Sequence, residues 1–141
     1  FGATTGRPRR CGWLDLPALR YAVRVNGLGG LVLNKLDVLS GFDRLALCVA
    51  YRVDGEPVRD FPSHATDLAA VEPVYDWLPG WSEDLRGCRR LADLPANARA
   101  YVARIEADLG IPCDVVSVGP DREETIVVRD AWGPHPRPLT R

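Results

Sequence analysis

The sequence predicts an α/β fold, because two stretches with helical spacing of apolar residues alternate with short apolar segments typical of buried strands. The 141 residues are 46% hydrophobic and 26% charged, which excludes an intrinsically disordered chain and allows a substantial core. No apolar run approaches the ~20 residues of a membrane-spanning helix. We therefore expect a mixed sheet, two main helices and long ordered loops.

The first third of the chain predicts a helix between a polar loop and a short strand. Residues 1–12 are rich in Gly, Thr and Arg and predict a loop. Asp15 is placed to cap a helix that runs to about Asn26, with Gly27 at its C-terminal end. The apolar residues 31–33 then predict a buried strand.

The middle of the chain predicts a hairpin followed by a loop-rich stretch. Residues 44–53 have a strong strand pattern, and the Asp-Gly pair at 54–55 predicts a turn into a second strand over 56–61. One further strand is expected near 71–77. The remainder of 62–90 is punctuated by Pro and Gly and predicts ordered loop.

A second helix and two strands are expected later in the chain. Asp93 is placed to cap a helix over about 94–109, which Gly110 would end. The Pro-rich sequence that follows Asp130 predicts a disordered tail. Two apolar segments predict strands, at 113–118 and 125–128.

The composition excludes several classes of function. Asp and Glu total 19 against 18 for Lys and Arg, so no basic field favours nucleic acid or an anionic membrane. The N-terminus lacks a secretory pattern, and we expect a cytoplasmic protein. Lys35 is the single lysine, which excludes a Gly-Lys-Ser/Thr phosphate loop from these residues. The chain has no methionine and begins at Phe1, which indicates a processed chain or a piece of a longer one.

Cysteine and histidine predict neither a metal centre nor a catalytic triad. The four cysteines are widely spaced, with no C-x-x-C pair, and we expect reduced thiols. The two histidines, at 64 and 135, lie in Pro- and Ser-containing segments and are interpreted as solvated loop residues. No metal ligand is expected.

The segment Asn34-Lys35-Leu36-Asp37 follows an apolar strand, at the position where α/β folds bind ligands. The Asp37 carboxylate can accept hydrogen bonds from N1–H and the exocyclic amino group of guanine, a donor pair that adenine lacks. The Lys35 stem can cover the purine face while its ammonium stays hydrated. Asn-Lys-x-Asp is the guanine-binding phrase of GTP-binding proteins. A solvated turn is the alternative interpretation.

Residues 2–10, with the sequence GATTGRPRR, have the composition of an anion-binding loop. Threonine hydroxyls and loop N–H groups can bind carboxylate oxygens, and arginine binds carboxylate or phosphate through two donors. Three arginines in four residues suit a loop that closes on an anionic substrate. A solvated basic terminus is the alternative.

Ser117-Val118-Gly119-Pro120 ends a second apolar strand, where Gly119 would let the backbone approach a flat ligand closely. An ordinary strand exit is the alternative. Residues 121–124 are interpreted as a solvated turn. Four aromatic residues are interpreted as packing residues, because no basic stripe accompanies them: Trp13, Tyr75, Trp77 and Trp81.

Together these segments resemble the C-terminal third of the adenylosuccinate synthetase family. The resemblance runs in order through GATTGRPRRCGWLDL, NKLDVL, EPVYDWLPGWSED, LPANARAYVARIE and SVGPDREETI. It implies that residues 1–130 are the C-terminal portion of a larger GTP-binding α/β domain and that 131–141 are a tail. It also implies a GTP-dependent ligase that phosphorylates the 6-oxygen of IMP, which L-aspartate then displaces to give adenylosuccinate for AMP biosynthesis. The family requires Mg²⁺, and a homodimer is expected for the full-length enzyme.

The resemblance also implies a role for each matching residue. Arg7 would bind IMP as well as aspartate, and Arg9 would reach the GTP phosphates. The aspartate-binding loop would comprise Ala3, Thr4, Thr5, Gly6, Arg7, Pro8 and Arg9. The guanine pocket for GTP would comprise Lys35, Leu36, Asp37, Ser117, Val118 and Gly119.

Two positions depart from the family pattern. Asn34 and Val118 each stand where the family usually has Thr, so a contact at Val118 must be through the backbone. The family's phosphate loop and catalytic Asp and His have no counterpart in these residues, so no catalytic residue is assigned and the isolated chain is expected to be inactive. A non-catalytic purine-nucleotide-binding remnant and a structural remnant without ligand remain as alternatives.

Overall fold

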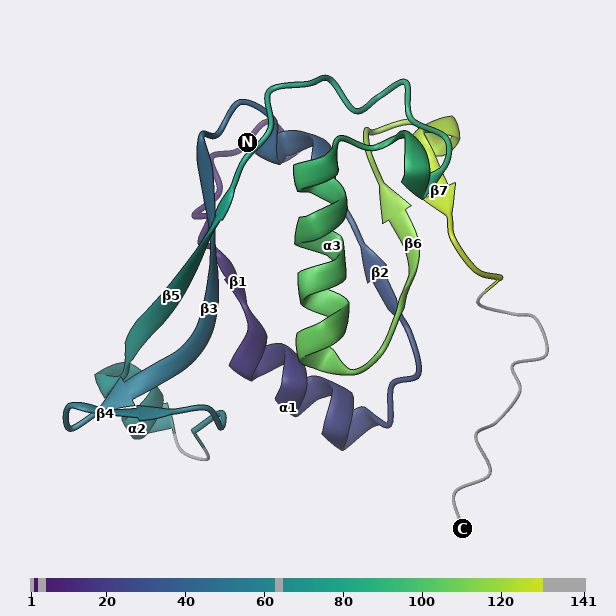
Figure 1. Cartoon of the computed structure of the whole chain (residues 1–141). Helices are drawn as coiled ribbons and strands as arrows, with labels where there is room; N and C mark the ends of the chain where they lie inside the picture. Colours follow the sequence, from purple (N-terminus) through teal and green to yellow (C-terminus); the bar gives the residue numbers. More distant parts are fainter. Residues whose placement is uncertain (1, 3–4, 63–64, 131–141) are drawn as a thin grey trace, which may run out of the picture.

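A computed structural model of the chain describes residues 2, 5–62 and 65–130. It contains two sheets and two long helices, which confirms the predicted α/β class with two main helices. Figure 1 shows helix α3 along the middle of the molecule, with one sheet on each side. The tail predicted over 131–141 lies outside the described residues.

The larger sheet is built around the long strand β3 (Arg44–Val53). Strand β5 (Glu72–Pro79) pairs antiparallel with one edge of β3 along most of its length. The other edge pairs in parallel with the two-residue strand β1 (Leu14–Asp15) and antiparallel with β4 (Glu56–Val58). The hairpin turn predicted at 54–55 is confirmed, with both residues at positive φ as a tight turn requires.

The smaller sheet contains three strands, two of which are parallel. Strand β2 (Leu31–Leu33) pairs in parallel with β6 (Cys113–Ser117), and β7 (Thr125–Val127) pairs antiparallel with β6. All three strands were predicted at these positions. Because β2 and β6 are parallel, the segments that follow their carboxyl ends leave the sheet at the same edge.

Helix α1 (Leu16–Asn26) begins and ends as its sequence predicts. The Asp15 carboxylate accepts the Ala18 N–H at 3.0 Å, which satisfies one of the unpaired donors of the first turn. Gly27 is left-handed, with φ of 60°, and its N–H bonds to the Val23 carbonyl.

Helix α3 (Ala96–Leu109) confirms the second predicted helix, but the proposed cap is wrong. Pro95 occupies the N-cap position and offers no side-chain bond. Asp93 ends a short 3₁₀ turn, η2 (Leu91–Asp93), and its carboxylate accepts the Arg90 N–H at 3.0 Å. The backbone at 94–95 is extended, so the Asp93 side chain caps this preceding turn instead of the helix.

A short helix, α2 (Ala65–Ala70), lies in the stretch where ordered loop was predicted. Six residues are too few for a clear helical pattern in the sequence. Within the described part of the chain, no helix is long and apolar enough to cross a membrane.

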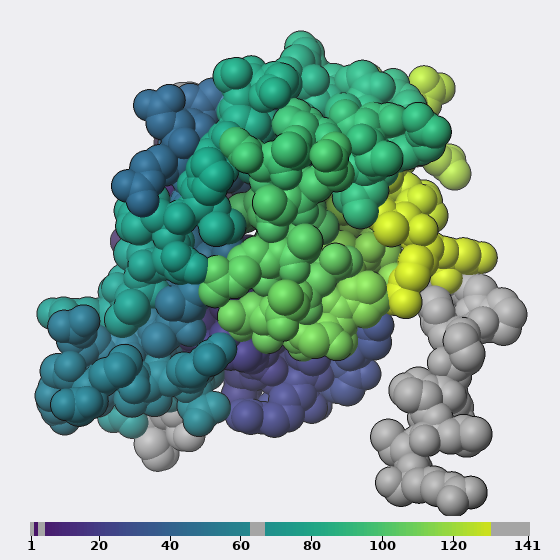
Figure 2. Space-filling view, viewed as in Figure 1, coloured from purple at the N-terminus to yellow at the C-terminus, as the bar shows by residue number. Residues whose placement is uncertain are grey.

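The core lies where α1 and α3 meet the two sheets. Leu16 of α1, Leu45 and Leu47 of β3, Ile105 of α3 and Val116 of β6 are fully buried in one cluster. Burying each such side chain contributes about 1.5–3 kcal/mol relative to exposure. Figure 2 shows the residues between β5 and α3, in teal, covering the upper end of this assembly.

An ion-pair network joins α1, α3 and the larger sheet around Asp108, whose side chain is only 5% exposed. Arg20 of α1 donates to the Asp108 carboxylate, and Arg59 and Arg104 each lie 3.8 Å from its second oxygen. Arg20 also donates to the carbonyls of Val49 (2.9 Å) and Arg59 (3.0 Å). The network therefore fixes α1 against the β3–β4 hairpin.

The cysteines provide a test of this fold. All four are free thiols, and Cys11 is exposed while Cys48, Cys88 and Cys113 are buried. Burial raises the pKa of the Cys113 thiol to about 11, helped by nearby Glu106, so little reactive thiolate forms at pH 8.

We expect one thiol per chain to react rapidly with Ellman's reagent in native buffer and four in guanidinium chloride. A Cys11→Ser variant should lose the native reaction. Rapid reaction of three or four thiols without denaturant would show that the chain does not adopt this fold.

Candidate nucleotide-binding site

The predicted guanine-binding segment leaves the smaller sheet beside the second predicted segment. Leu33 of β2 pairs with Val116 of β6, and the two parallel strands end at the same edge of the sheet (Figure 1). Asn34 follows β2 at this edge, and Ser117 is the last residue of β6. The structure therefore brings residues 34–37 and 117–120 together, as ligand-binding loops of an α/β sheet require.

The backbone of the first segment is held in an uncommon conformation. Lys35 has φ of 61°, a left-handed value that few non-glycine residues adopt. It precedes the 3₁₀ turn η1 (Leu36–Leu39), whose first residue, Leu36, is 1% exposed and packs in the core. The Leu36 side chain thus anchors the turn, and contact with a ligand at Leu36 would be through its backbone.

Asp37 carries an unsatisfied acceptor. Its Oδ1 atom is buried and has no hydrogen-bond partner among the residues that the structure describes. A buried polar atom without a partner is destabilising, so its presence points to a missing donor. Asp37 lines an open cavity of about 500 Å³, together with Ser40, Gly41, Ser82, Asp84, Arg86 and Pro120.

Three further lining residues, Ser82, Asp84 and Arg86, come from the loop after β5. The sequence did not predict this loop as part of the site. The Trp81 indole N–H donates to Ser40 Oγ at 3.0 Å, and the Trp81 carbonyl accepts the Gly41 N–H at 2.8 Å. The neighbouring Gly80 carbonyl accepts from the Asn97 side chain of α3 at 2.7 Å. These bonds fasten the end of the turn that contains Asp37 to the loop after β5, and that loop to helix α3.

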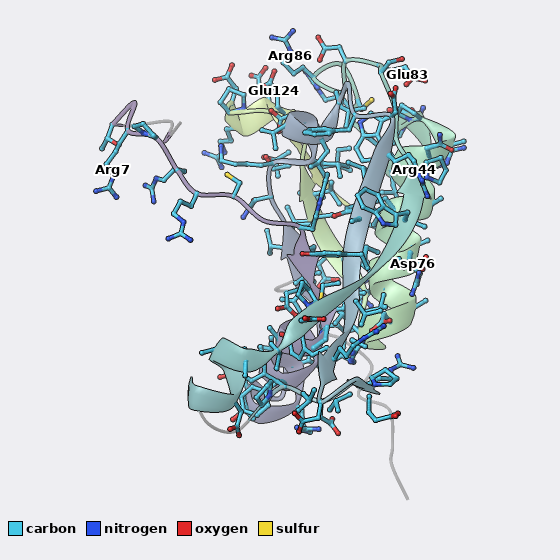
Figure 3. All side chains as sticks on the ribbon, turned by 90° about the vertical axis from the view of Figure 1, so that its left-hand side faces the viewer. Arg7, Arg44, Asp76, Glu83, Arg86 and Glu124 are labelled. Carbon is cyan, nitrogen blue, oxygen red and sulfur yellow. The ribbon has the colours of Figure 1, made fainter. Side chains whose placement is uncertain are left out.

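An ion pair between Asp84 and Arg86 lines the same cavity. Arg86 Nη2 lies 2.6 Å from Asp84 Oδ2, and Arg86 Nε donates to both Asp84 oxygens at 3.0 and 3.1 Å. The Arg86 guanidinium lowers the pKa of Asp84 to about 2, so this pair stays charged at ordinary assay pH and is lost only as the pH falls toward 2. Figure 3 places Arg86 and Glu124 at the same end of the molecule.

The second predicted segment, residues 117–120, lies at this edge of the sheet and contacts Glu124 of the same chain. The Val118 side chain is fully buried in the core, and its N–H donates to the Glu124 carbonyl at 2.8 Å. A Cβ at Gly119 would lie 2.1 Å from Glu124 Oε2, so the Glu124 side chain packs closely against this glycine. Ser117 Oγ donates to the Gly119 carbonyl at 3.0 Å.

The predicted anion-binding loop projects away from this cavity. Figure 3 shows Arg7 on an arm that extends from the body of the molecule. The arm is folded on itself by bonds from Gly6 N–H to the Gly2 carbonyl and from Gly2 N–H to the Arg7 carbonyl, at 2.9 and 2.8 Å. The side chains of Thr5, Pro8 and the arm's arginines are exposed, while Ala3 and Thr4 lie outside the described residues.

The base of the arm lies beside residues 34–36. Gly12 and Trp13 line a second cavity, of about 460 Å³, together with Asn34, Lys35 and Leu36. The two predicted sites are therefore neighbours, although the charged tip of the arm does not reach the Asp37 cavity. In chemical terms, the arrangement offers a carboxylate for a planar donor pair and a set of guanidinium groups for anions.

No metal centre is indicated in this part of the chain. Among the residues that the structure describes, no three His, Cys, Asp or Glu side chains form a group that could hold a metal ion.

Gly80 is expected to be intolerant of a side chain. A Cβ at this position would lie 1.8 Å from the Phe42 carbonyl oxygen, which is backbone and cannot rotate away. We expect Gly80→Ala to lower the free energy of unfolding by about 1–3 kcal/mol, measured by guanidinium chloride titration of the 141-residue chain.

Gly87→Ala in the same loop is the matched control, because a Cβ there has no neighbour within 4 Å. Equal stability of the two variants would contradict the close contact between Gly80 and Phe42.

Comparisons with known proteins point to one family. A family model described as adenylosuccinate synthetase matches residues 1–126. The adenylosuccinate synthetase of Brevibacillus brevis is 53% identical over 133 residues, and that of Acidothermus cellulolyticus 55% identical over 130. A solved structure of fully ligated adenylosuccinate synthetase from Plasmodium falciparum matches 92% of the chain, with 41% identity and a TM-score of 0.84.

These matches cover most of this chain but a minor part of each relative. The match to the Brevibacillus protein covers 94% of this chain and 31% of the relative. The match to the Plasmodium structure likewise covers 31% of that chain. The chain therefore spans about a third of the length of the proteins it is similar to.

Proposed function

Because the chain belongs to the adenylosuccinate synthetase family, we propose that it supplies the guanine pocket and the aspartate-binding loop of a GTP-dependent ligase that joins IMP and L-aspartate. Two observations carry the proposal: Asp37 lines a cavity at the carboxyl ends of β2 and β6, and its Oδ1 atom is buried without a hydrogen-bond partner among the described residues. N1–H of guanine is a donor of the kind this oxygen lacks.

Guanine recognition requires the backbone as well as the carboxylate. The Asp37 carboxylate would accept from guanine N1–H and the exocyclic amino group, and the stem of the exposed Lys35 would cover one face of the ring. Leu36 and Val118 have buried side chains and would contribute only backbone groups. Ser117 and Gly119 would complete the wall.

The arm would bind the anionic groups of the substrates. Thr5, Gly6, Arg7, Pro8 and Arg9, with Ala3 and Thr4, would bind the carboxylates of L-aspartate. Arg7 would also contact IMP, and Arg9 the GTP phosphates. Guanidinium groups bind carboxylate and phosphate through two donors, and the exposed arm leaves these groups available.

The chemical step would need groups from outside this third of the family's fold. Mg²⁺ would supply charge stabilisation for the transferring phosphoryl group, and its ligands are proposed to lie mostly in the part that the chain does not span. We further propose a homodimer for the full-length enzyme and a cytoplasmic location.

A pair of assays tests the proposal. We expect no measurable adenylosuccinate from the 141-residue chain with IMP, GTP, aspartate and Mg²⁺. A chimera is then made in which this chain replaces the matching 31% of the Brevibacillus synthetase, and we expect it to be active.

Each outcome has a distinct meaning. Adenylosuccinate formation by the chain alone would overturn the proposal that catalytic groups lie elsewhere. A folded chimera that binds GTP but makes no product would favour the alternative of a non-catalytic purine-nucleotide-binding remnant. A folded chimera that does not bind GTP would favour a structural remnant.

A further inference from the structure

Glu124 is the last residue of the loop that joins β6 to β7. The loop runs over 118–124, and its start belongs to the second guanine-binding segment. Pro120 lines the same cavity as Asp37, and Figure 3 places Glu124 at the same end of the molecule as Arg86, which also lines that cavity. Loops between paired antiparallel strands are commonly about two to five residues long, so this longer loop needs bonds of its own to stay in one conformation.

The main chain of Glu124 closes this loop at its base. The Glu124 carbonyl accepts the Val118 N–H at 2.8 Å, and the Glu124 N–H donates to the Asp121 carbonyl at 3.0 Å. Neither bond involves Gly119 or Pro120, which lie between the residues that these bonds hold. Both bonds use main-chain atoms, so they do not depend on which side chain residue 124 carries.

The side chain of Glu124 reaches back over the loop and holds its middle. Glu124 Oε2 accepts the Asp121 N–H at 3.0 Å, as part of a reciprocal capping arrangement around the 3₁₀ turn η3 (Arg122–Glu124). The same oxygen fills the space beside Gly119, where a Cβ would lie only 2.1 Å from it. The carboxylate therefore lies directly against the backbone of the second guanine-binding segment.

Two further contacts hold the start of the loop. The Ser117 hydroxyl donates to the Gly119 carbonyl at 3.0 Å, and the buried Val118 side chain anchors the chain in the core. Gly119 is therefore held by Ser117 through its carbonyl and by the Glu124 carboxylate beside its Cα atom. These contacts set the position of its backbone groups before any nucleotide binds.

We propose that Glu124 is a positioning residue for guanine recognition, whose carboxylate holds residues 117–120 in the conformation that receives the base. This inference rests on the proposed guanine site. A loop that is ordered before the base arrives loses less conformational entropy on binding, so the Glu124 carboxylate raises affinity for GTP through the loop. A role through charge is the competing explanation, because Arg86 lines the Asp37 cavity and its charge interacts with that of Glu124.

Two substitutions in the chimera separate these explanations by steady-state kinetics. Glu124→Ala removes the carboxylate and keeps the main-chain bonds, whereas Glu124→Gln keeps an acceptor oxygen and a similar shape without the charge. We expect Glu124→Ala to raise KM for GTP about tenfold, with kcat and the KM values for IMP and aspartate within about twofold of the unsubstituted chimera. We expect Glu124→Gln to keep KM for GTP within about twofold, because the amide oxygen can still accept the Asp121 N–H.

Glu123→Ala is the matched control, because Glu123 is a neighbouring carboxylate in the same turn with an exposed side chain. Its kinetic values should equal those of the unsubstituted chimera. An unchanged KM for GTP in Glu124→Ala would overturn the proposal. A Glu124→Gln variant as weak as Glu124→Ala would also overturn it, and would assign the effect to the charge that faces Arg86. Parallel rises in KM for all three substrates would show a general structural role instead.

Amide hydrogen exchange in the 141-residue chain, measured by NMR, tests the positioning without a nucleotide. We expect Glu124→Ala to speed exchange of the Val118 and Asp121 amides at least about tenfold, because the loop opens more often without the carboxylate. The amides of α1 should keep their rates. Unchanged exchange at both loop amides would overturn the positioning role. Faster exchange together with an unsubstituted chimera that does not bind GTP would support that role and count against the proposed function alone.

Discussion

Replacing Asp37 with asparagine is expected to move the nucleotide preference of the chimera from GTP toward XTP. Asparagine keeps one oxygen that can accept guanine N1–H, but its amino group meets the exocyclic amino group of guanine, and two donors repel. Xanthine carries a carbonyl oxygen at that position, which the asparagine amino group can bind. Loss of a charge-assisted pair of bonds should lower kcat/KM for GTP about 100-fold or more.

The measurement is steady-state kinetics with GTP and XTP at saturating IMP and aspartate. Glu56→Gln in the exposed strand β4 is the control and should leave both values unchanged. If Asp37→Asn retains the wild-type preference for GTP, then Asp37 does not read the base, and the buried Oδ1 requires another explanation.

Asp108→Ala is expected to lower the free energy of unfolding strongly. The carboxylate is 5% exposed and interacts with three arginines, of which Arg20 is itself largely buried. Its removal leaves the Arg20 charge without a counter-charge beside the Val49 and Arg59 carbonyls. Breaking a buried ion pair from one side costs about 3–5 kcal/mol, more than the pair itself contributes.

Guanidinium chloride unfolding of the 141-residue chain, followed by tryptophan fluorescence, measures this loss. Asp60→Ala is the matched control, since its carboxylate lies 3.8 Å from Arg24 but is 82% exposed. An exposed pair of this kind contributes about 0–1 kcal/mol. Similar effects of the two substitutions would show that the Asp108 network is not a buried unit.

Local signals in the sequence predicted most elements of this fold. The Asp15 cap and Gly27 set the ends of α1, and the Asp-Gly pair set the hairpin, because each depends on residues a few positions apart. Reasoning from neighbouring residues also explains the error at Asp93, because aspartate commonly caps the start of a helix. Its carboxylate caps the preceding turn, a choice set by the extended backbone at Pro95.

The site was less predictable where it depends on contacts between distant segments. The Asn-Lys-x-Asp phrase marked Asp37 directly, but nothing local to Trp81 indicates that it bonds to Ser40, which is 41 residues away. Likewise, nothing local to Gly119 indicates that the Glu124 side chain packs against it. The four aromatic residues do make ring contacts, as predicted, but the exposed outer sides of Tyr75 and Trp77 follow from the sheet pairing and could not be predicted from composition.

The bonds from Trp81 to Ser40 and Gly41, and from Asn97 to Gly80, have a consequence for affinity. Conformational entropy of the turn that holds Asp37 is lost when the chain folds, not when a base arrives. A purine would therefore meet a preorganised carboxylate, and less of its intrinsic interaction energy would be lost to ordering. The same bonds commit this turn to one geometry, which favours selectivity between bases over adaptability.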